Sequence, residues 1–414
     1  MHAQPLSIII VGAGISGLTA AIALTKQGHH VVVLEKSKFN RETGAAIHVA
    51  PNCTAVLEWL GLDPRDFGGT VLEKVGSYTS QGMTKHSRDF SNDRASWQAG
   101  YYLVLRAELH AALKERAFKT AEIHTGCNIV NIDISADRPS VALDDGRVFE
   151  ADLVVGADGL NSIVRKEIAP EAAAPTPSDD SCFRWLLQAS ELRKLATTQD
   201  MIRPGVFMEF SAPKARLVVY PCADNEIINL CAFIPTTEAG GLGEGWNASG
   251  SKVALKKAFA DFCPGVVEMV ERADDDLKMW QLYDMESLPR WVTERAALIG
   301  DSAHPFQPFL GQGGAMAMED GVSLAIMLPF GTKIQDIPAR LRLYEEARRE
   351  RVEMTLKYTR LNSFQEGDPR ASRVPPAEMV RFLEIVMSHN EMTHSTAIMQ
   401  QSLLDSNGVV GQQA

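Results

Sequence analysis

The start of the chain combines apolar runs with a helical pattern and predicts a strand, a helix and a second strand. Ile8–Val11 is a short apolar run that we expect to form a buried strand. Residues 15–26 continue with apolar positions at helical spacing up to Gly28, which predicts a helix. The run HVVVLEK, residues 30–36, is rich in valine, as buried parallel strands tend to be. Such a unit implies a right-handed crossover in a parallel sheet.

The rest of the chain predicts further helices, a hairpin and a set of antiparallel strands. Residues 106–117 predict an amphipathic helix, and residues 141–156 predict a hairpin turning at Asp145-Gly146, followed by a buried strand. Residues 206–210, 215–220 and 226–233 are strand-like runs separated by turn residues, which indicates antiparallel strands. Residues 295–304 return to the buried-strand pattern, and residues 340–358 predict a helix whose arginines and glutamates form a solvated face with i,i+4 pairing.

These elements indicate an α/β fold with a Rossmann-type dinucleotide-binding domain, a second domain on an antiparallel sheet, and C-terminal helices. We expect the dinucleotide-binding domain in residues 1–175, the second (substrate) domain in 176–288, a return segment and helix of the first domain in 289–360, and a helical tail in 361–414. The Pro/Ala-rich residues 170–178 are the expected crossing between domains.

Composition and charge exclude several classes of protein. The net charge of -11 over 414 residues argues against a nucleic-acid partner, which requires a basic surface. The six cysteines are scattered without a CxxC pair, so we expect neither a zinc site nor a disulfide framework, and no metal. The start lacks the pattern of a signal peptide, and no apolar run is long enough to span a bilayer, so we expect a cytoplasmic protein without a membrane partner.

A glycine-rich motif supplies the first chemistry. Gly12, Gly14 and Gly17, with Ser16 between them, fit GxGxxG after a strand and before a helix. In that context the glycines permit a tight turn, a close approach to a pyrophosphate and packing of helix on strand. Glu35, next to Lys36, ends the second strand, where a carboxylate can accept hydrogen bonds from ribose hydroxyls and would repel a 2′-phosphate. The sequence therefore predicts a dinucleotide site that favours FAD or NAD over NADP.

A second glycine-rich stretch lies far downstream. Gly300-Asp301 follows a buried strand, and proline and glycine then dominate up to Gly314, where a helix begins. Together with the GADG stretch that contains Asp158-Gly159, these residues resemble the single-component FAD-dependent aromatic hydroxylases. The resemblance is strongest to the branch of salicylate hydroxylases and hydroxynicotinate monooxygenases, and it extends from the N-terminus to about Arg351.

The resemblance implies a role for each motif in this chain. The GxGxxG motif is then expected to bind the ADP half of FAD, Asp158 to help bind both FAD and NAD(P)H, and Asp301 to contact the ribityl chain. Backbone at Pro308, Gly311, Gln312, Gly313 and Gly314 is expected to face the isoalloxazine ring. Arg106 is expected to reach the FAD phosphate and ribityl region. The segment from Gly44 to Asn52, which contains Ala46, is expected to run beside the flavin.

The resemblance also implies the reaction. NADH or NADPH reduces FAD, O2 adds to give a C4a-hydroperoxyflavin, and one oxygen is transferred to a small phenolic or carboxylic aromatic or heteroaromatic substrate, with or without decarboxylation. A phenolic substrate reacts faster as its phenolate, so a base within hydrogen-bond reach is useful. His48 is the first candidate for this base, because its ordinary pKa of about 6.5 suits proton transfer at neutral pH. Tyr220, at the end of an expected strand, is a second candidate that orients or deprotonates the substrate.

Other residues are expected to have structural roles. We interpret His304 as structural or flavin-positioning, Cys222 and Cys231 as core or cavity-lining thiols, and Met316, Met318 and Met327 as helix packing. Arg184 is interpreted as a surface arginine, and contact with the FAD phosphate or with NAD(P)H is its alternative role.

Two alternative functions remain open at this point. One is a FAD-dependent epoxidase or hydroxylase of a terpenoid or indole-alkaloid intermediate in secondary metabolism, which needs no substrate base. The other is a nonenzymatic escort protein of the same fold. We expect the partners to be a small aromatic substrate and O2, and the chain to act as a monomer or homodimer.

Overall fold

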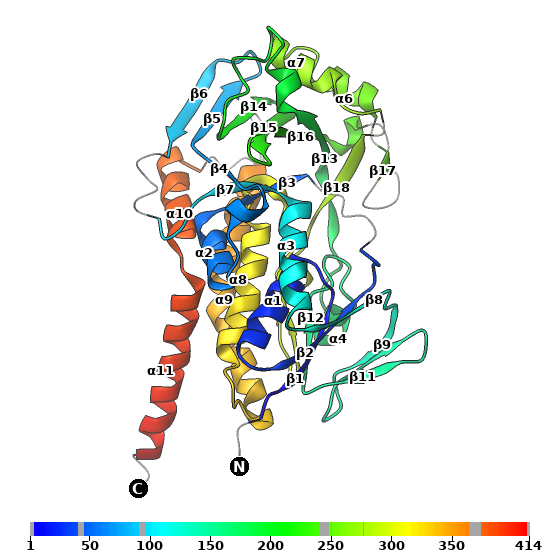
Figure 1. Cartoon of the computed structure of the whole chain (residues 1–414), viewed down its shortest axis with the longest axis vertical. Coiled ribbons are helices and arrows are strands. Elements are labelled where there is room, and N and C mark those ends of the chain that lie inside the picture. Colours follow the sequence, from blue (N-terminus) through cyan, green and yellow to red (C-terminus); the bar gives the residue numbers. More distant parts are fainter. Residues whose placement is uncertain are drawn as a thin grey trace.

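The computed structural model describes residues 4–39, 45–90, 97–239, 248–249, 251–275, 277–363 and 374–411. Within these ranges the strands form a five-stranded, an eight-stranded and two three-stranded sheets. Figure 1 shows the eight-stranded sheet at one end of the molecule and the five-stranded sheet, with its helices, at the other. The α/β fold class is therefore confirmed.

The five-stranded sheet is parallel throughout and carries the predicted strand–helix–strand unit. Its order is β19 (Ala296–Leu298), β12 (Leu153–Gly156), β1 (Ser7–Val11), β2 (His30–Glu35) and β8 (Glu122–Thr125). The helix α1 (Ile15–Lys26) begins and ends at the predicted residues. Ile9 at the centre of the sheet pairs with Val32 on one side and Val154 on the other. The apolar runs are buried because helices cover the sheet, as parallel sheets require.

The eight-stranded sheet is antiparallel apart from the parallel pair β14–β5. Its order is β17 (Ala248–Ser249), β18 (Lys278–Asp284), β13 (Thr176–Gln188), β16 (Ile227–Pro235), β15 (Ala215–Cys222), β14 (Val206–Ala212), β5 (Lys74–Thr79) and β6 (Thr84–Asp89). The predicted antiparallel strands at 206–233 are confirmed.

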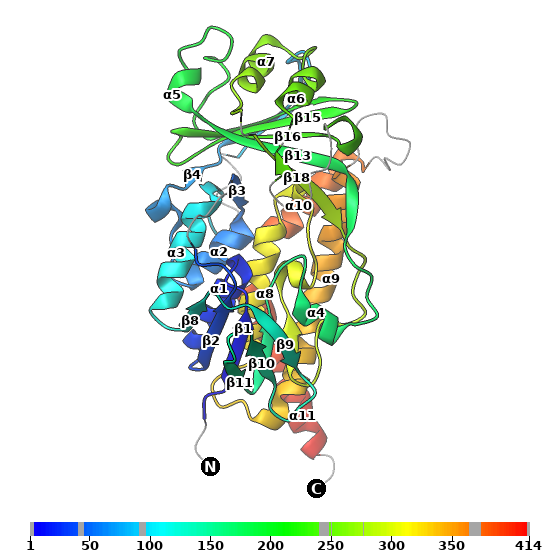
Figure 2. The same ribbon diagram turned by 90° about the vertical axis from the view of Figure 1, so that its right-hand side faces the viewer.

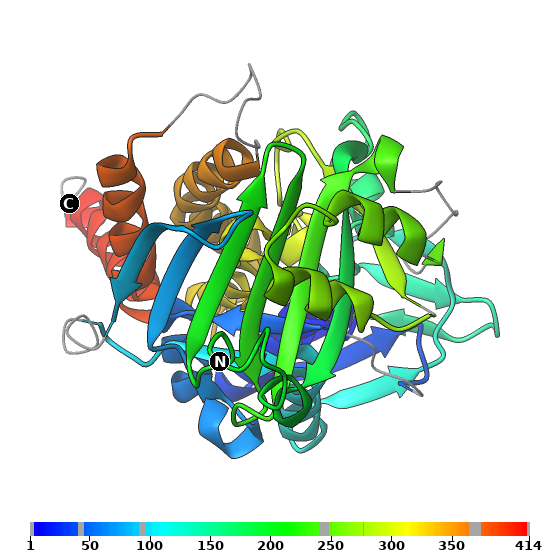
Figure 3. The ribbon, with the colours of Figure 1, turned by 90° about the horizontal axis from the view of Figure 1, so that it is seen from above.

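Alternation along these strands gives the sheet two different faces. Phe183, Leu217 and Leu230 point to one face, where they pack with residues of α6 (Lys252–Ala258) and α7 (Pro264–Glu271). Figures 2 and 3 show these two helices lying across that face. Their neighbours in sequence point to the opposite face, toward the parallel sheet, and this second face carries the site described below.

The division into domains stays a prediction, but the pairing of strands differs from a simple split at residue 175. The strands β5 and β6 come from the first segment and complete the sheet formed mainly by residues 176–288. The strand β13 also begins at Thr176, inside the stretch that the sequence marked as a linker. The strand β6 lies at the edge of the sheet and has a polar sequence, so no apolar run marks it.

Two three-stranded sheets complete the fold. One has the order β11 (Val148–Glu150), β10 (Ser140–Leu143) and β9 (Ile129–Asp133), and its β10–β11 pair is the predicted hairpin. The other has the order β3 (Ala46–Val49), β7 (Tyr102–Leu105) and β4 (Thr70–Val71). The second sheet matters most here, since it brings His48 and the start of α3 (Arg106–Phe118) to one place.

The helix α8 (Gly313–Met327) is buried almost throughout. The helices α2 (Pro51–Trp59), α9 (Ile337–Ser363) and α11 (Glu391–Gly411) pack against it. Of the others, α4 (Ile163–Ile168) packs on the parallel sheet, α5 (Ala189–Leu192) on β13, and α10 (Pro376–Ser388) on α2. Met316, Met318 and Met327 lie in the core, as expected. Among the described residues, the longest apolar stretches of helix fall short of what crossing a membrane demands.

The prediction of a solvated charged face on α9 is wrong for two of its arginines. Arg348 is completely buried and Arg351 is 8% exposed. Both form ion pairs with carboxylates of other helices, including Glu319 of α8. A charge-rich helical pattern looks the same whether its partners are solvent and i,i+4 neighbours or buried acids contributed from far along the chain.

Candidate active site

A cavity of about 710 Å³ lies between the eight-stranded sheet and the N-terminal ends of α1 and α8. Its wall includes many of the predicted site residues, namely Gly14, Ser16, Ala46, His48, Arg106, Tyr220, Asp301, Pro308, Gly311, Gly313 and Gly314. These residues come from segments far apart in the sequence, and the fold therefore brings most of the predicted site together.

The glycine-rich turn forms one end of the cavity. Gly12 has φ of +102°, and a Cβ there would lie 2.4 Å from the Ala157 carbonyl oxygen. A Cβ on Gly17 would lie 2.0 Å from the Gly12 carbonyl oxygen, so these two glycines serve close backbone packing. Gly14 differs, because a Cβ there would meet nothing within 4 Å and the residue faces the cavity. The turn thus leaves open space at the start of α1, where unpaired N–H groups favour an anion.

Glu35 and Lys36 lie outside the cavity wall. The Glu35 carboxylate accepts hydrogen bonds from the backbone N–H of Ala13 and of Ser37, each at 2.7 Å. Lys36 is exposed. Glu35 therefore fastens the glycine-rich turn, and its contact with a ribose stays a prediction.

The Asp-Gly motif is divided between two tasks. Gly159 lines the cavity. The carboxylate of Asp158 instead accepts from the Ser162 hydroxyl at 2.5 Å and from the backbone N–H of Ile163 at 2.7 Å, at the start of α4. Asp158 is thus engaged in capping a helix, which its position in the sequence did not indicate.

The downstream motif forms the middle of the cavity. Asp301 is exposed to the cavity, and Gly300, with φ of +62°, lies against Ser16 of α1. Gly313 and Gly314 begin α8, and Gln312 before them makes no side-chain cap, so a second helix N-terminus opens at the cavity wall. His304, next to this motif, is buried, and its Nε2 lies 2.7 Å from Asp320, in agreement with a structural role.

Of the segment expected beside the flavin, Gly44 lies outside the described residues, whereas Ala46 and His48 are placed on β3. The side chain of His48 lines the cavity beside Gly311. Its Nδ1 lies 2.9 Å from the Tyr101 hydroxyl oxygen. Burial lowers the pKa of His48 to about 4, so its imidazole is neutral at physiological pH. It is also a weaker base than the ordinary pKa of about 6.5 suggested.

Tyr220 also lines the cavity, but its hydroxyl is already engaged. It donates to the Ala46 carbonyl oxygen at 2.7 Å, and its ring packs 4.9 Å from that of His48. Burial raises the pKa of Tyr220 well above its ordinary value. This geometry favours a positioning role over proton abstraction.

The inner face of the eight-stranded sheet adds residues that the sequence did not single out. Strand register places one row of residues across six strands, from β13 to β6. Five members of this row line the cavity, namely Arg184, Cys231, Val218, Glu209 and His86. The interpretation of Arg184 as a surface arginine is therefore wrong. Cys231 lies in the cavity wall and Cys222 in the core, as expected. The row is invisible in one strand's sequence because it depends on how strands pair.

Two further parts of the site were missed. Tyr101, which contacts His48, stands just before β7, and nothing in its local sequence distinguishes it from a core tyrosine. The helix α10 lies in the segment expected to be a tail, yet Met379, Leu383 and Met387 form part of the cavity wall.

Taken together, the residues fit a dinucleotide with two polar ends. The open space at Gly14 and two helix N-termini suit phosphate and electron-rich groups. The Asp301 carboxylate lines the same cavity and can accept hydrogen bonds from hydroxyls. The apolar remainder of the wall, near His48, suits a second, aromatic molecule.

Comparison with known proteins agrees with this geometry. The family model described as "FAD binding domain" matches residues 6–359. The chain is 30% identical to a hispidin-3-hydroxylase of Neonothopanus nambi, over 97% of this chain and 98% of the relative. It is also 30% identical to a 3-hydroxybenzoate 6-hydroxylase of Aquipseudomonas alcaligenes, over 86% and 88%. A salicylate hydroxylase in complex with its substrate has the same fold, with a TM-score of 0.80, 20% identity, and coverage of 95% and 98%.

Proposed function

Because the chain belongs to the FAD-binding-domain family, among the single-component flavoprotein aromatic hydroxylases, and is a flavoprotein monooxygenase, we propose that it hydroxylates a small phenolic compound bound beside His48. The observation that carries the proposal is the neutral His48, bonded to Tyr101 and placed between the apolar cavity wall and the loop before α8. The relatives are named as hydroxylases, so the nonenzymatic escort alternative is set aside.

Bound FAD accepts reducing equivalents from NADH or NADPH and supplies the chemistry by which O2 delivers one oxygen atom to the substrate ring. We propose that Gly14 and the start of α1 hold its phosphates, Asp301 its ribityl hydroxyls, and the backbone at Pro308, Gly311, Gly313 and Gly314 its ring system. The residues of the chain then bind the substrate, exclude water and move one proton.

His48 is the proposed base. With Nδ1–H donating to the Tyr101 hydroxyl oxygen, Nε2 carries a lone pair and makes no hydrogen bond to any described residue. A phenol placed at Nε2 can transfer its proton there, and the resulting phenolate is a more electron-rich ring. The imidazolium would keep its bond to Tyr101, which holds the ring in orientation.

Tyr220 is proposed to shape the cavity and not to carry the proton. Its hydroxyl donates to Ala46, and its ring stacks on Phe207 with centroids 5.7 Å apart. Both rings support His48, since Phe207 lies 5.4 Å from it. Apolar walls of this kind keep water from the reacting atoms.

The experiment measures NADH and NADPH oxidation and hydroxylated product with a panel of hispidin, 3-hydroxybenzoate, 6-hydroxynicotinate, salicylate and indole. We expect a phenolic member to stimulate oxidation and to be hydroxylated. His48→Asn should lower the rate of hydroxylation about 10²–10⁴-fold, and raising the pH should restore part of it because the phenol then ionises unaided. His86→Asn, a cavity-lining histidine on β6, is the matched control. A His48→Asn enzyme as active as the control would contradict the proposed base.

A second candidate is oxygenation of a larger apolar compound, such as a terpenoid or an indole alkaloid. The apolar face of α10 in the cavity wall supports it. Under this alternative, indole or a terpenoid is oxygenated and His48→Asn leaves the rate unchanged. The preference between NADH and NADPH, the monomer or homodimer, and the cytoplasmic location stay predictions.

A further inference from the structure

A buried polar contact holds the helix α10 against the cavity. Its apolar residues Met379, Leu383 and Met387 line the cavity. At its last turn, the carbonyl oxygen of Val386 accepts a hydrogen bond from Nη2 of Arg351 at 3.0 Å. The pairs that Glu384 and Glu378 form with Arg88 and Tyr358 are exposed, and such pairs contribute little. Arg351 is thus a principal buried anchor of α10.

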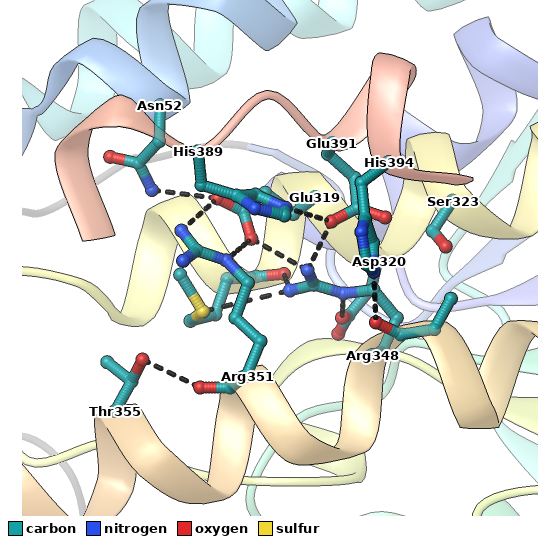
Figure 4. Close-up of polar contacts among 12 residues, drawn as sticks. Asn52, Glu319, Asp320, Ser323, Arg348, Arg351, Thr355, His389, Glu391 and His394 are labelled. Atoms are coloured by element: carbon teal, nitrogen blue, oxygen red, sulfur yellow. Dashed lines mark hydrogen bonds and ion pairs between the residues drawn. The ribbon is translucent and has the colours of Figure 1, made fainter. Parts of the chain in front are cut away.

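The same guanidinium forms a bidentate ion pair with Glu319 of α8. Nε of Arg351 lies 2.8 Å from Oε2 of Glu319, and Nη2 lies 2.8 Å from Oε1. Figure 4 shows the two side chains facing each other, with Arg348 on the other side of Glu319. Burial alone would raise the pKa of Glu319, but Arg351 and Arg348 hold it well below its ordinary value. Glu319 is therefore an anion that accepts hydrogen bonds and cannot donate them.

Asn52 of α2 extends this arrangement to the loop at the cavity. Its Nδ2 donates to Oε1 of Glu319 at 2.8 Å and to Oε1 of Gln312 at 3.1 Å. Because the carboxylate only accepts, the amide of Asn52 must present its NH2 group, and Gln312 must in turn present its oxygen. Gln312 is 1% exposed, and its Nε2 has no partner among the described residues. Asn52 therefore fixes how Gln312 sits between Gly311 and Gly313, which line the cavity.

This cluster is better explained by ion pairing than by a metal. Glu319, His389 and Glu391 bring ligand atoms within 4.8 Å of one another. However, Arg348 already donates to both glutamates, at 2.7 Å and 2.5 Å, and so places a cation between them. The carboxylates thus serve to hold arginines in fixed places.

We propose that Asn52, Glu319 and Arg351 are positioning residues that couple the loop at Gln312 to the cavity wall formed by α10. The path runs from the Val386 carbonyl through Arg351, Glu319 and Asn52 to Gln312. Its two ends border the same cavity, one at the loop proposed to face the flavin and one at the wall proposed to face the substrate. Binding of a flavin ring against the loop at Gln312 should therefore also order α10. The inference rests on the proposed FAD site.

The test measures amide hydrogen exchange in α10 of the full chain, with FAD removed and with FAD restored. In the wild type, FAD should slow exchange in residues 377–388 by about tenfold, a usual size for coupling between two sites. Asn52→Leu breaks the path near the loop, and Arg351→Lys breaks it near α10, because one ammonium cannot replace a guanidinium that serves Glu319 and Val386 together. Both variants should still bind FAD, by quenching of flavin fluorescence, and should lose the slowing.

Thr54→Val is the matched control. Thr54 is a buried residue of α2, and its hydroxyl donates, within the described part of the chain, only to the Val49 carbonyl oxygen at 3.2 Å. It should keep the full tenfold effect. If Asn52→Leu and Arg351→Lys bind FAD and keep the slowing, FAD orders α10 by direct contact and the coupling proposal fails. An absence of slowing in the wild type overturns it too. A wild-type chain that does not bind FAD overturns the proposed function instead. If Asn52→Leu no longer binds FAD, the hydrogen exchange of Arg351→Lys alone decides whether the coupling proposal holds.

Discussion

Replacing either of two glycines of the first motif by alanine should have opposite effects on stability and on FAD affinity, although Gly14 and Gly17 are only three positions apart. A methyl group on Gly17 would lie 2.0 Å from the Gly12 carbonyl oxygen and 3.2 Å from Cβ of Ala157. Non-bonded carbon and oxygen atoms keep about 3 Å or more, so α1 would have to move about 1 Å away from the turn. The helix is buried between the parallel sheet and α8 and cannot move freely. Overpacking of this kind costs about 1–3 kcal/mol or more, and we expect Gly17→Ala to lie at the upper end.

Gly14→Ala places its methyl group in open space at the cavity, since nothing lies within 4 Å. The apoprotein should lose at most about 1 kcal/mol, the usual difference between glycine and alanine at an N-cap. FAD affinity should fall sharply, because the methyl group occupies the space at the helix N-terminus. Urea unfolding of both apoproteins gives the stabilities, and fluorescence titration gives the FAD affinities. If Gly17→Ala is as stable as Gly14→Ala, the argument from the 2.0 Å contact is refuted; if Gly14→Ala binds FAD like the wild type, the phosphate site lies elsewhere.

Three further predictions follow from buried groups. Arg348→Met leaves Glu319, Asp320 and Glu391 without their shared cation, so urea unfolding should show a loss of about 3–5 kcal/mol in the free energy of unfolding. Arg342→Met, at a position on the same helix that is 66% exposed, should lose less than about 1 kcal/mol. Equal losses would contradict the buried ion pairing of Arg348. The pKa of His48 is about 4 in the folded chain against 6.5 ordinarily, so the unfolded chain takes up the proton first. Stability should therefore fall by up to about 3 kcal/mol as the pH drops from 6.5 to 4, without change above that window, and His48→Leu should remove this component from unfolding curves measured across pH. Tyr101→Phe removes the bond to His48 and should lower kcat for hydroxylation about tenfold, while Tyr220→Phe should mainly lower stability, by about 1 kcal/mol; a larger loss of kcat for Tyr220→Phe would reverse the two roles.

Local sequence signals predicted the glycine-rich turn and most of the residues on that side of the cavity, but not the contacts of Glu35 and Asp158. The bounds of α1 and the turn at Gly12 follow from apolar spacing and from glycines that tolerate close contact, both of which are local properties. The return of Asp301 and Gly313 to the same cavity follows from the parallel order of β1, β12 and β19, because the carboxyl ends of parallel strands meet at one edge.

The substrate half depends on pairing between distant strands and helices. Arg184 and Glu209 share a row only because β13, β16, β15 and β14 pair in a particular register. Arg348 and Arg351 become buried only because α8 supplies Glu319 and Asp320 opposite them. Neither fact can be obtained from the periodicity of one segment, which is why a cavity wall was interpreted as surface and a buried network as a solvated face.

The entry of β5 and β6 into the larger sheet has a consequence for how such a protein changes over evolution. A segment covering residues 176–288 lacks two strands of its own sheet, and β14 would be left with an open edge. Exchange of that segment between relatives by recombination would therefore separate strands that need each other. New substrate ranges are expected to arise instead by single replacements on the inner face, where each alternate residue of a strand can vary without disturbing the packing on the other side.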